Sequence, residues 1–488
     1  MKLSQIVATD MFLPPEWDRD VNHIVTDSRD VAAGDLFIAR AGSGEHGEKY
    51  IDAALAAGAA AVVADGDMAF RCATGGVPVF TTPGVRAALS QWLSRRYRNA
   101  ADVQLIGVTG TNGKSSVTQY CAQLLAAMNS ACGVIGTLGN GLWPDLQPTR
   151  NTTPDICLSY RLLDELGVQG AAAAALEVSS HGLHQGRVAG LQFAVAVLTN
   201  VTQDHLDYHG DMEAYFAAKA QLFTSGIAAS AVINIDDSYG RRLWNSEARP
   251  EHAISVGRSD GAMLRYSDVQ FTAQGMTAVL NSPWGSLSLN VGLIGEFNIA
   301  NTVAAIAALT MLGHDFSALV KAAGKLQPVA GRMELYIAPE KPLAVIDFAH
   351  TPDALSNVIA AVGNAGREVT VVFGCGGDRD RSKRPLMVQA VANAMRVWVA
   401  DDNPRTENPE QIFADIRQAE ASRNFTFEHE RSAAISAAVA ATPQDGIVVI
   451  AGKGHETYQE ILGVRHSYSD DSALRALGYR KAGGDHVA

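Results

Sequence analysis

The chain has 488 residues, and 39 Lys and Arg against 51 Asp and Glu give it a formal net charge of −12. Hydrophobic residues make up 47% of it and charged residues 18%, a composition that can bury several cores and that excludes wholesale disorder. The negative charge excludes non-specific binding to nucleic acid or to an anionic membrane, because both need a basic surface.

At about 150 residues per domain, the length predicts about three domains. Residues 1–98 are expected to form a small α/β domain: 35–40 and 78–82 are predicted strands, 50–65 is a helix followed by a strand, and 85–97 is a helix.

Residues 99–328 are predicted to form a central α/β domain. An apolar strand at 103–110, a glycine-rich loop at 111–116 and a helix at 117–128 open it, and strand-helix alternation resumes from residue 171. This alternation is typical of a mostly parallel sheet covered by helices. Residues 262–291 hold short alternating runs around glycine turns, which predict antiparallel hairpins, and a helix follows at 298–312.

Residues 329–488 are predicted to form a third, Rossmann-like domain after a linker at 325–333. Four buried strands are expected at 343–348, 368–374, 396–402 and 446–452, separated by helical segments. The fold class is therefore α/β, with a small first domain, a central domain with a P-loop and a Rossmann-like third domain.

Five cysteines lie far apart and none has CxxC spacing, which favours a reducing compartment over disulfides or structural zinc. The first twenty residues hold no sustained apolar run, so we expect no signal peptide, and no apolar stretch is long enough to span a bilayer. The expected location is the cytoplasm.

The segment GVTGTNGKSS at 107–116 is typical of a phosphate-binding loop. Loop amides and the start of the helix can face a phosphate, Lys114 can neutralise it, and the Ser115 hydroxyl can reach magnesium. The spacing is GxxGKS from Gly110 rather than GxxxxGKS/T. A flexible turn with an isolated lysine is the alternative, which the strand before and the helix after disfavour.

A second group of polar residues follows the predicted strands of the central domain. Glu177 lies at a strand end and, with Ser115, predicts a magnesium site, since magnesium prefers oxygen ligands. A zinc site is the alternative, on His181, His184, His205 and His209. Lys219, taken alone, is predicted to be a solvated lysine on an amphipathic helix. Asn298 and Asn301 can either cap a helix or bind an adenine edge.

The third domain places charges of both signs after its strands, at Arg379, Asp402, Arg405 and Glu456. Arginine binds carboxylates in a fork and acidic groups pair with ammonium, so a site with both signs suits a zwitterionic amino acid. A surface salt-bridge network is the equally weighted alternative.

Ten sequence blocks follow one another in a fixed order: TGTNGKS, EVSSHGL, TNVTQDHLDYHG, AAKAQLF, GxFNxxN, GRME, DFAHTPD, FGCGGDRD, DDNPR and AGKGHE. In this the chain resembles the Mur ligases of peptidoglycan synthesis. The resemblance implies a UDP-binding domain, an ATPase and a Rossmann-like domain. It also implies that ATP activates a carboxylate as an acyl phosphate, which an amine then attacks. The last two blocks are similar to the branch that adds meso-diaminopimelate to UDP-N-acetylmuramoyl-L-alanyl-D-glutamate.

The resemblance assigns roles in the ATP and metal site. Lys114, Glu177, His205 and Lys219 are implied as catalytic residues. The implied ATP-binding residues are Gly110, Thr111, Asn112, Gly113, Lys114, Ser115, Ser116, Asn301, Arg332 and Asp347. Two Mg²⁺ ions are implied, held by Ser115, Glu177, His205 and Lys219, the last as a carbamate formed with CO₂.

The resemblance also assigns the two other substrates. The implied contacts to the UDP-muramoyl dipeptide are Thr26, Ser28, Ser43, Asn151, Thr152, Thr153, Ser179, Gln185 and Arg187. The implied contacts to diaminopimelate are Arg379, Asp402, Asn403, Pro404, Arg405, Gly452 and Glu456. The loop SGEHG at 43–47 lacks the family's His-Gln pair, and Thr26 replaces a more usual apolar residue.

Three other functions stay open at this point. The first is a lysine-adding ligase, which typically lacks the arginine of the DNPR block. The second is a folate-type polyglutamate ligase, which needs neither that arginine nor the TDSR block at 26–29. The third is a non-catalytic regulator, which would lose Lys114, Glu177 or His205, and all three are present. The resemblance implies a monomer that binds neither nucleic acid nor membrane.

Overall fold

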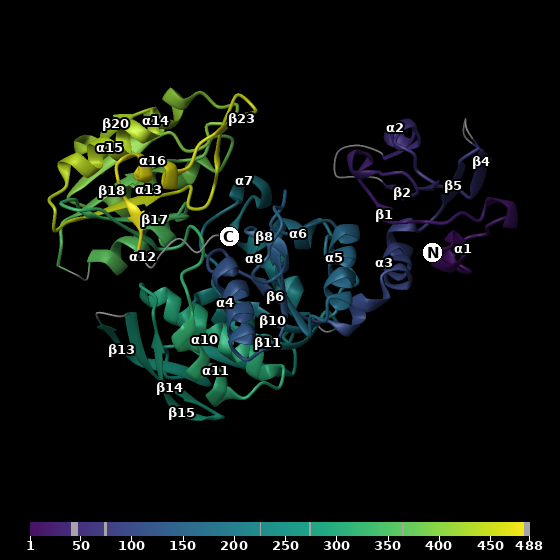
Figure 1. Cartoon of the computed structure of the whole chain (residues 1–488), viewed down its shortest axis with the longest axis horizontal. Helices are drawn as coiled ribbons and strands as arrows, with labels where there is room; N and C mark the ends of the chain where they lie inside the picture. Colours follow the sequence, from purple (N-terminus) through teal and green to yellow (C-terminus); the bar gives the residue numbers. More distant parts are fainter. Residues whose placement is uncertain (41–46, 73–75, 225, 273–274, 364–365, 483–488) are drawn as a thin grey trace.

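The computed structural model describes residues 1–40, 47–72, 76–224, 226–272, 275–363 and 366–482. They fold around three main sheets on successive stretches of the chain, with the N-terminal unit at one end and the C-terminal unit beside the central one (Figure 1). None of the helices in these ranges is both long and apolar enough to cross a membrane.

The N-terminal sheet has five strands in the order β1-β2-β3-β5-β4. The first four are parallel and β4 is an antiparallel edge strand. The strands are β1 (Ile24–Val25), β2 (Leu36–Ala39), β3 (Ala61–Asp65), β4 (Ala69–Cys72) and β5 (Pro78–Thr82), and the helices are α1 (Leu3–Val7), α2 (Ile51–Ala56) and α3 (Val85–Arg96). The strands and helices predicted for this unit are confirmed.

The central sheet has ten strands in the order β15-β14-β13-β12-β11-β10-β6-β9-β7-β8. Its strands are β6 (Gln104–Thr109), β7 (Cys132–Gly136), β8 (Gly139–Leu142), β9 (Ala173–Glu177), β10 (Phe193–Leu198), β11 (Ala228–Asn234), β12 (His252–Gly257), β13 (Leu264–Thr272), β14 (Gly275–Ser282) and β15 (Gly285–Val291). In the order of the sheet, the strands from β13 through β6 to β7 pair in parallel, and β8 is antiparallel to β7. At the other end β13, β14 and β15 are antiparallel, which confirms the hairpins predicted at 262–291.

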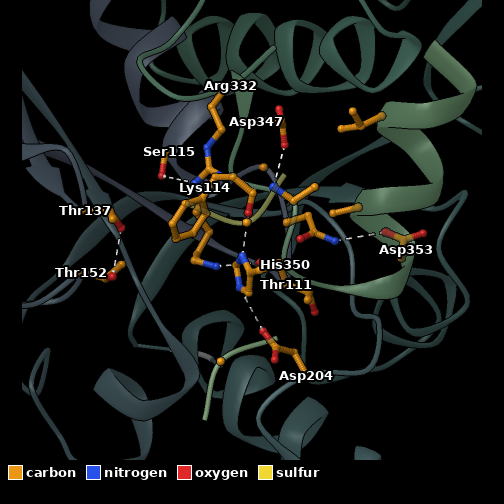
Figure 2. Close-up of a pocket in the computed structure, with 18 of the residues that line it drawn as sticks. Thr111, Lys114, Ser115, Thr137, Thr152, Asp204, Arg332, Asp347, His350 and Asp353 are labelled. Carbon is orange, nitrogen blue, oxygen red and sulfur yellow. Dashed lines mark hydrogen bonds and ion pairs between the residues drawn. The ribbon is translucent and has the colours of Figure 1, made fainter. Parts of the chain in front are cut away.

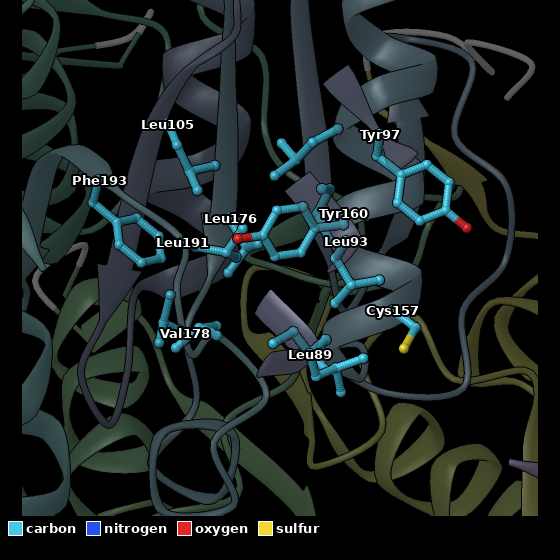
Figure 3. Packing of buried hydrophobic residues seen from close by; sticks show 14 of the residues in the cluster. Leu89, Leu93, Tyr97, Leu105, Cys157, Tyr160, Leu176, Val178, Leu191 and Phe193 are labelled. Carbon is cyan, nitrogen blue, oxygen red and sulfur yellow. The ribbon is translucent and has the colours of Figure 1, made fainter. Parts of the chain in front are cut away.

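Helices cover both faces of the central sheet. They are α4 (Lys114–Ala127), α5 (Ile156–Val168), α6 (Ser180–His184), α7 (Leu206–His209), α8 (Met212–Ala220), α9 (Ser238–Trp244), α10 (Glu296–Met311) and α11 (Phe316–Ala322). The buried side chains of α4, α10 and α11 form one apolar core, and those of α3, α5 and α9 belong to another. Figure 3 shows part of this second core. Leu89 and Leu93 of α3, and Tyr97 directly after it, lie near Cys157 and Tyr160 of α5. The N-terminal unit therefore shares a core with the central one.

The C-terminal sheet has seven strands in the order β20-β19-β18-β21-β17-β16-β24. Its strands are β16 (Glu334–Ile337), β17 (Leu343–Asp347), β18 (Val369–Phe373), β19 (Arg396–Ala400), β20 (Thr426–Glu428), β21 (Ile447–Ala451) and β24 (Arg480–Lys481), and β22 (Tyr458–Ile461) and β23 (Val464–Ser467) form a separate hairpin. The helices are α12 (Pro352–Gly363), α13 (Arg384–Val391), α14 (Pro409–Arg417), α15 (Arg431–Ala441) and α16 (Asp470–Ala476). The four strands predicted here are confirmed and run parallel, so their carboxyl ends share one edge.

Candidate active site

A cavity of about 410 Å³ lies between the central and C-terminal units, and Figure 2 shows part of its lining. Most of the residues singled out in the sequence line it: Thr111, Asn112, Gly113, Lys114, Ser115, Ser116, Thr152, Glu177, Ser179, His205, Asn301, Arg332, Asp347, Arg379, Asp402, Asn403, Arg405, Gly452 and Glu456. Others that the structure describes are outside this lining: Gly110, Lys219, Thr26, Ser28, Asn151, Thr153, Gln185, Arg187 and Pro404. Ser43 lies outside the described residues.

The glycine-rich loop joins β6 to α4 in a tight turn, as predicted. Gly110 and Gly113 have φ angles of 149° and 88°, a region that favours glycine. A side chain on Gly113 would lie 2.5 Å from Asn301 Oδ1, so the loop packs directly against α10. Lys114 opens α4 and its Nζ donates to the carbonyls of Gly110 and Thr111, both at 2.9 Å. The loop is thus part of a regular strand-loop-helix, and Lys114 binds its carbonyl groups. This excludes the alternative of a flexible turn with an isolated lysine.

Lys219 is buried, with 1% of its surface exposed, so the prediction of a solvated lysine is wrong. The reason is its neighbours on α8, because Tyr215, Phe216 and Ala218 are buried as well. Its Nζ donates to the Gly110 carbonyl at 2.8 Å and lies 4.4 Å from the centre of the Tyr215 ring. Burial and the nearby Lys114 cation hold the pKa of Lys219 well below its usual value, which favours a neutral, nucleophilic amine.

Glu177 is the last residue of β9 and is 2% exposed. Its carboxylate accepts hydrogen bonds from the Thr137 amide at 2.9 Å and from the Thr137 hydroxyl at 3.2 Å. The Thr137 hydroxyl also lies 2.9 Å from the Thr152 hydroxyl, so one threonine connects the predicted metal ligand with the predicted substrate loop (Figure 2). Thr137 was missed in the sequence because nothing in its local pattern singles it out.

Asp204 joins the two units at the cavity. Its buried carboxylate lies 3.4 Å from Lys383 Nζ and 3.7 Å from His350 Nε2, both from the C-terminal unit (Figure 2). Burial alone would raise its pKa, but His350, Lys383 and His205 outweigh it and lower the pKa well below the usual value. The next residue, His205, has a left-handed φ of 55°, and burial together with nearby cations lowers its pKa to about 3, so the imidazole is neutral.

The glycine-rich loop is also flanked by three residues from later in the chain, Asn301, Arg332 and Asp347. Arg332 donates to Ser115 Oγ at 3.5 Å and lies over the Phe348 ring at 4.4 Å. Asp347 accepts from two backbone amides, those of Met333 at 2.8 Å and Ala349 at 2.7 Å, and burial raises its pKa.

The two asparagines predicted as helix caps lie inside α10, which begins at Glu296 after Gly295. The capping alternative is therefore wrong for both. Asn298 is bonded within the core, to the Tyr120 hydroxyl and the Ile294 carbonyl, whereas Asn301 faces the cavity. Only Asn301 is placed to contact a ligand.

The residues predicted to bind the muramoyl dipeptide fall into two groups. Thr153 Oγ1 lies 2.9 Å from Ser179 Oγ, and Arg187 binds the Thr153 carbonyl at 2.8 Å and the Gln185 amide oxygen, which forms one network beside Glu177. Asn151 is exposed in the preceding loop, and Thr26 and Ser28 lie in the N-terminal unit after β1. An ion pair between Arg150 and Asp30, at 3.0 Å, joins that unit to the loop.

The residues predicted to bind the amino acid come together around a lysine that the sequence analysis did not single out. Lys453 is fully buried, and its Nζ lies 2.9 Å from Glu456, 3.2 Å from Asn403 and 3.8 Å from Asp402. Asn403 also donates to Glu456 at 2.8 Å. Asp402, Asn403 and Glu456 also line the cavity, so the residues predicted to bind the amino acid form a salt-bridge network that faces it.

Arg405 has a left-handed φ of 54°, and its guanidinium donates to the Gly377 carbonyl at 2.7 Å. Gly377 packs against the Pro404 carbonyl so closely that a side chain there would clash, which makes Pro404 part of the turn rather than of the lining.

Other lining residues were missed although their blocks were recognised. They include His350 and Asp353 of DFAHTPD and Gly376 of FGCGGDRD, and Lys383, three residues after that block, lines the cavity as well. Asp353 accepts from Asn112 at 3.1 Å, a contact between the C-terminal unit and the glycine-rich loop. The spacing of these blocks was visible in the sequence, but which side chain turns inward depends on how the two units meet.

The four histidines of the alternative zinc site lie near one another, with ring centres of His181 and His205 4.8 Å apart. Within the described part of the chain, no three His, Cys, Asp or Glu side chains are arranged to hold a metal ion. The zinc alternative is therefore not supported.

Comparison with known proteins connects these features to one family. The Mur ligase family catalytic domain matches residues 20–97, the Mur ligase middle domain 108–309 and the Mur ligase glutamate ligase domain 331–454. The chain belongs to the Mur ligase family. It is 45% identical over 471 residues to the UDP-N-acetylmuramoyl-L-alanyl-D-glutamate--2,6-diaminopimelate ligase of Pseudomonas aeruginosa, covering 95% of this chain and 96% of that one.

Solved structures agree with this membership. One of a UDP-N-acetylmuramoyl-L-alanyl-D-glutamate--2,6-diaminopimelate ligase is 38% identical, covers 98% of both chains and has a TM-score of 0.67. A folylpolyglutamate synthase from Mycobacterium tuberculosis is 20% identical with a TM-score of 0.63, and covers 74% of this chain and 91% of that one. The second likeness is one of fold, which the Mur ligase family shares with that enzyme.

Proposed function

We propose that the protein is an ATP-dependent amide ligase that adds meso-diaminopimelate to UDP-N-acetylmuramoyl-L-alanyl-D-glutamate, in cytoplasmic peptidoglycan precursor synthesis. The observation that carries this is the single cavity with a phosphate-binding loop on one side and an amino-acid cluster of both charge signs on the other. The relatives named above, which match the chain over nearly its full length, support the same reaction.

The first step activates a carboxylate. A carboxylate oxygen of the dipeptide attacks the γ-phosphorus of ATP, ADP leaves, and an acyl phosphate forms. Lys114 and the amides of the loop bind the phosphates and stabilise the charge that develops on them, which is the main task in phosphoryl transfer. Arg332 adds a second positive charge beside Ser115. Asn301 and Asp347 line the ATP side of the cavity, where the proposed contacts are to adenine and ribose.

The second step forms the amide. The amine of the amino acid attacks the acyl carbon, and the tetrahedral intermediate collapses with release of inorganic phosphate. Thr152, Ser179, Gln185 and Arg187 hold the dipeptide next to Glu177, so that its carboxylate meets the γ-phosphate. Thr26, Ser28 and the loop around Asn151 are the proposed contacts to the nucleotide and sugar.

The donor atoms fit Mg²⁺. Ser115 and Glu177 offer oxygen, and the neutral amine expected at the buried Lys219 is the form that can take up CO₂ as a carbamate, which would add an anionic oxygen donor. We assign two Mg²⁺ ions to Ser115, Glu177, His205 and carbamylated Lys219. Bound there, the metal would neutralise phosphate charge.

Selectivity for diaminopimelate is assigned to Arg405 and Arg379, with Asp402, Asn403, Gly452 and Glu456 around them. Diaminopimelate is lysine with a second carboxylate on the far carbon. When lysine binds instead, the arginine that would bind this carboxylate has no partner. The loss of that interaction costs a few kcal/mol of binding free energy, which is on the order of a hundredfold in selectivity.

We divide the work among three domains: residues 1–98 bind the UDP-sugar, 99–328 bind ATP and carry out the reaction, and 329–488 bind the amino acid. A monomer suffices for this reaction, because one chain supplies every proposed contact.

The direct test is phosphate release in the presence of the UDP-dipeptide, ATP and Mg²⁺, with diaminopimelate, lysine or glutamate added separately. We expect release with diaminopimelate only. Release with lysine alone would indicate the lysine-adding ligase, release with glutamate alone a polyglutamate ligase, and no release with any of them would reject the proposal.

A further inference from the structure

His429 lies outside the cavity and connects the two ends of the loop that carries the amino-acid cluster. This loop runs from Asp401, directly after β19, to Glu410 in the first turn of α14. His429 follows β20, which pairs in parallel with β19. Its Nδ1 lies 3.0 Å from Asp401 Oδ1 and its Nε2 lies 2.8 Å from Glu410 Oε1. One imidazole thus closes a loop of ten residues.

The ring is held in this orientation from the side. It stacks on Phe413 of α14, with ring centres 4.3 Å apart and planes 3° from parallel. Arg417 lies 3.4 Å from the second oxygen of Glu410 and stacks over Phe413 and Phe427. The hairpin after β21 contacts the same loop, since Gln459 donates to the Asp401 carbonyl at 3.2 Å.

The chemistry of the two partners requires a protonated ring. Ionised carboxylates only accept hydrogen bonds, and imidazole donates from both nitrogens only as imidazolium. The neutral ring would keep one bond and turn a lone pair toward the other carboxylate. Both bonds therefore exist together only while His429 is charged.

We propose that His429 is a positioning residue that closes the 401–410 loop as a clamp, and so keeps Asp402, Asn403 and Arg405 in place for the incoming amino acid. This rests on the proposed assignment of those three residues to diaminopimelate. His429 itself does not line the cavity, so it acts through the loop and not on the substrate.

The charges around the ring set the pH range of the clamp. Asp401 and Glu410 contact the ring, Arg417 and Arg431 act on these two partners, and Glu428 and Glu430 are the charged neighbours of His429 in the chain. Burial disfavours the charged ring, but the hydrogen bonds to Glu410 and Asp401 outweigh it and raise the pKa of His429 above 6.5. A raised folded pKa means that the clamp is complete below about pH 6.5 and is lost as the pH rises through the folded value.

The test is steady-state kinetics of the full chain with His429→Gln. We expect the KM for diaminopimelate to rise about threefold to tenfold at neutral pH, as for loss of a part-exposed charged hydrogen bond, with kcat and the KM for ATP unchanged. The ratio of the two KM values, variant over wild type, should fall toward one as the pH is raised, because the wild-type ring then loses its proton.

Arg396→Gln is the matched control, because Arg396 opens β19 at the end opposite the loop and pairs there with Glu368 at 3.2 Å. It should leave every KM unchanged. If His429→Gln lowers the thermal midpoint too far for assay, Glu410→Ala removes the acceptor at one end of the clamp, at an exposed side chain, and decides the question. An unchanged KM for diaminopimelate, or a ratio that does not vary with pH, would overturn the clamp.

Arg405→Ala separates the clamp from the site assignment. If Arg405→Ala raises the KM for diaminopimelate and His429→Gln does not, the clamp alone is rejected. If Arg405→Ala leaves that KM unchanged, the loop is not the amino-acid site, and the assignment on which the clamp rests is rejected with it.

Discussion

Three cations that line the cavity differ in their partners from two buried cations elsewhere in the C-terminal unit, whereas Lys383, which also lines the cavity, is paired with Asp204. Lys114 binds the carbonyls of the loop, Arg332 binds a hydroxyl, and Arg405 binds the carbonyl of Gly377. Arg431 and Arg384, by contrast, are bound to carboxylates, Arg431 to Asp470 at 2.8 Å and Arg384 to Glu407 at 2.7 Å. A cation that binds neutral oxygens keeps its charge for an anionic ligand, whereas a cation already paired serves the fold. The protein carries net negative charge, and this division supports the proposed sites for ATP and a dicarboxylic amino acid at Lys114, Arg332 and Arg405.

The largest effect is expected at Lys219, whose buried amine binds only the Gly110 carbonyl and the Tyr215 ring among the described contacts. Lys219→Ala should lower kcat by about a hundredfold to a thousandfold even at saturating Mg²⁺, as for loss of one group that stabilises transition-state charge. Phosphate release measures it, and Lys321→Ala, at an exposed position of α11, is the control. Full activity of Lys219→Ala would reject the carbamate role.

At Arg431 we expect a loss of stability, because the ion pair between Arg431 and Asp470 is fully buried. Arg431→Ala leaves a buried carboxylate without its partner and should lower the free energy of unfolding by about 3–5 kcal/mol, as measured by urea unfolding. The double variant Arg431→Leu with Asp470→Leu should recover most of this loss, since neither charge then remains. A double variant as unstable as the single one would show that the pair contributes more than charge compensation.

A smaller effect is expected from His209, which lies near Lys219, His181 and His184. Burial, with the two histidines and Lys219, lowers the pKa of His209 to about 4. A folded pKa below the unfolded value means that the unfolded chain binds the proton first, so stability falls as the pH drops from about 6.5. The thermal midpoint should therefore fall by less in His209→Asn than in the wild type when the pH is lowered from 7 to 5. An identical loss in both proteins would contradict this.

Much of the fold follows from local sequence pattern. Strand-helix alternation and the glycine-rich turn gave the parallel sheets and the phosphate loop, because those depend on residues close together in the chain. The errors concern burial set by distant contacts: Lys219 is enclosed by its own helix and the Gly110 carbonyl, and Asn298 is bonded to Tyr120 rather than to a helix end.

The parts of the site that were missed share one cause. Thr137, Lys453 and Lys383 each contact a group far away in sequence: Thr137 contacts Glu177, Lys453 contacts Asn403, and Lys383 contacts Asp204. Lys453 lies in the recognised block AGKGHE, but a block does not say which distant residue each of its side chains contacts. The fold of each unit brings Thr137 to Glu177 and Lys453 to Asn403, and the packing of the C-terminal unit on the central one brings Lys383 to Asp204.

If a cation without a carboxylate partner is reserved for an anionic group of the substrate, Arg405 is the residue at which this is measured most directly. The measurement is the ratio of kcat/KM for diaminopimelate to that for lysine, in the wild type and in Arg405→Ala. We expect a ratio well above one for the wild type that falls by about tenfold to a hundredfold in the variant. An unchanged ratio, with both substrates affected equally, would contradict it.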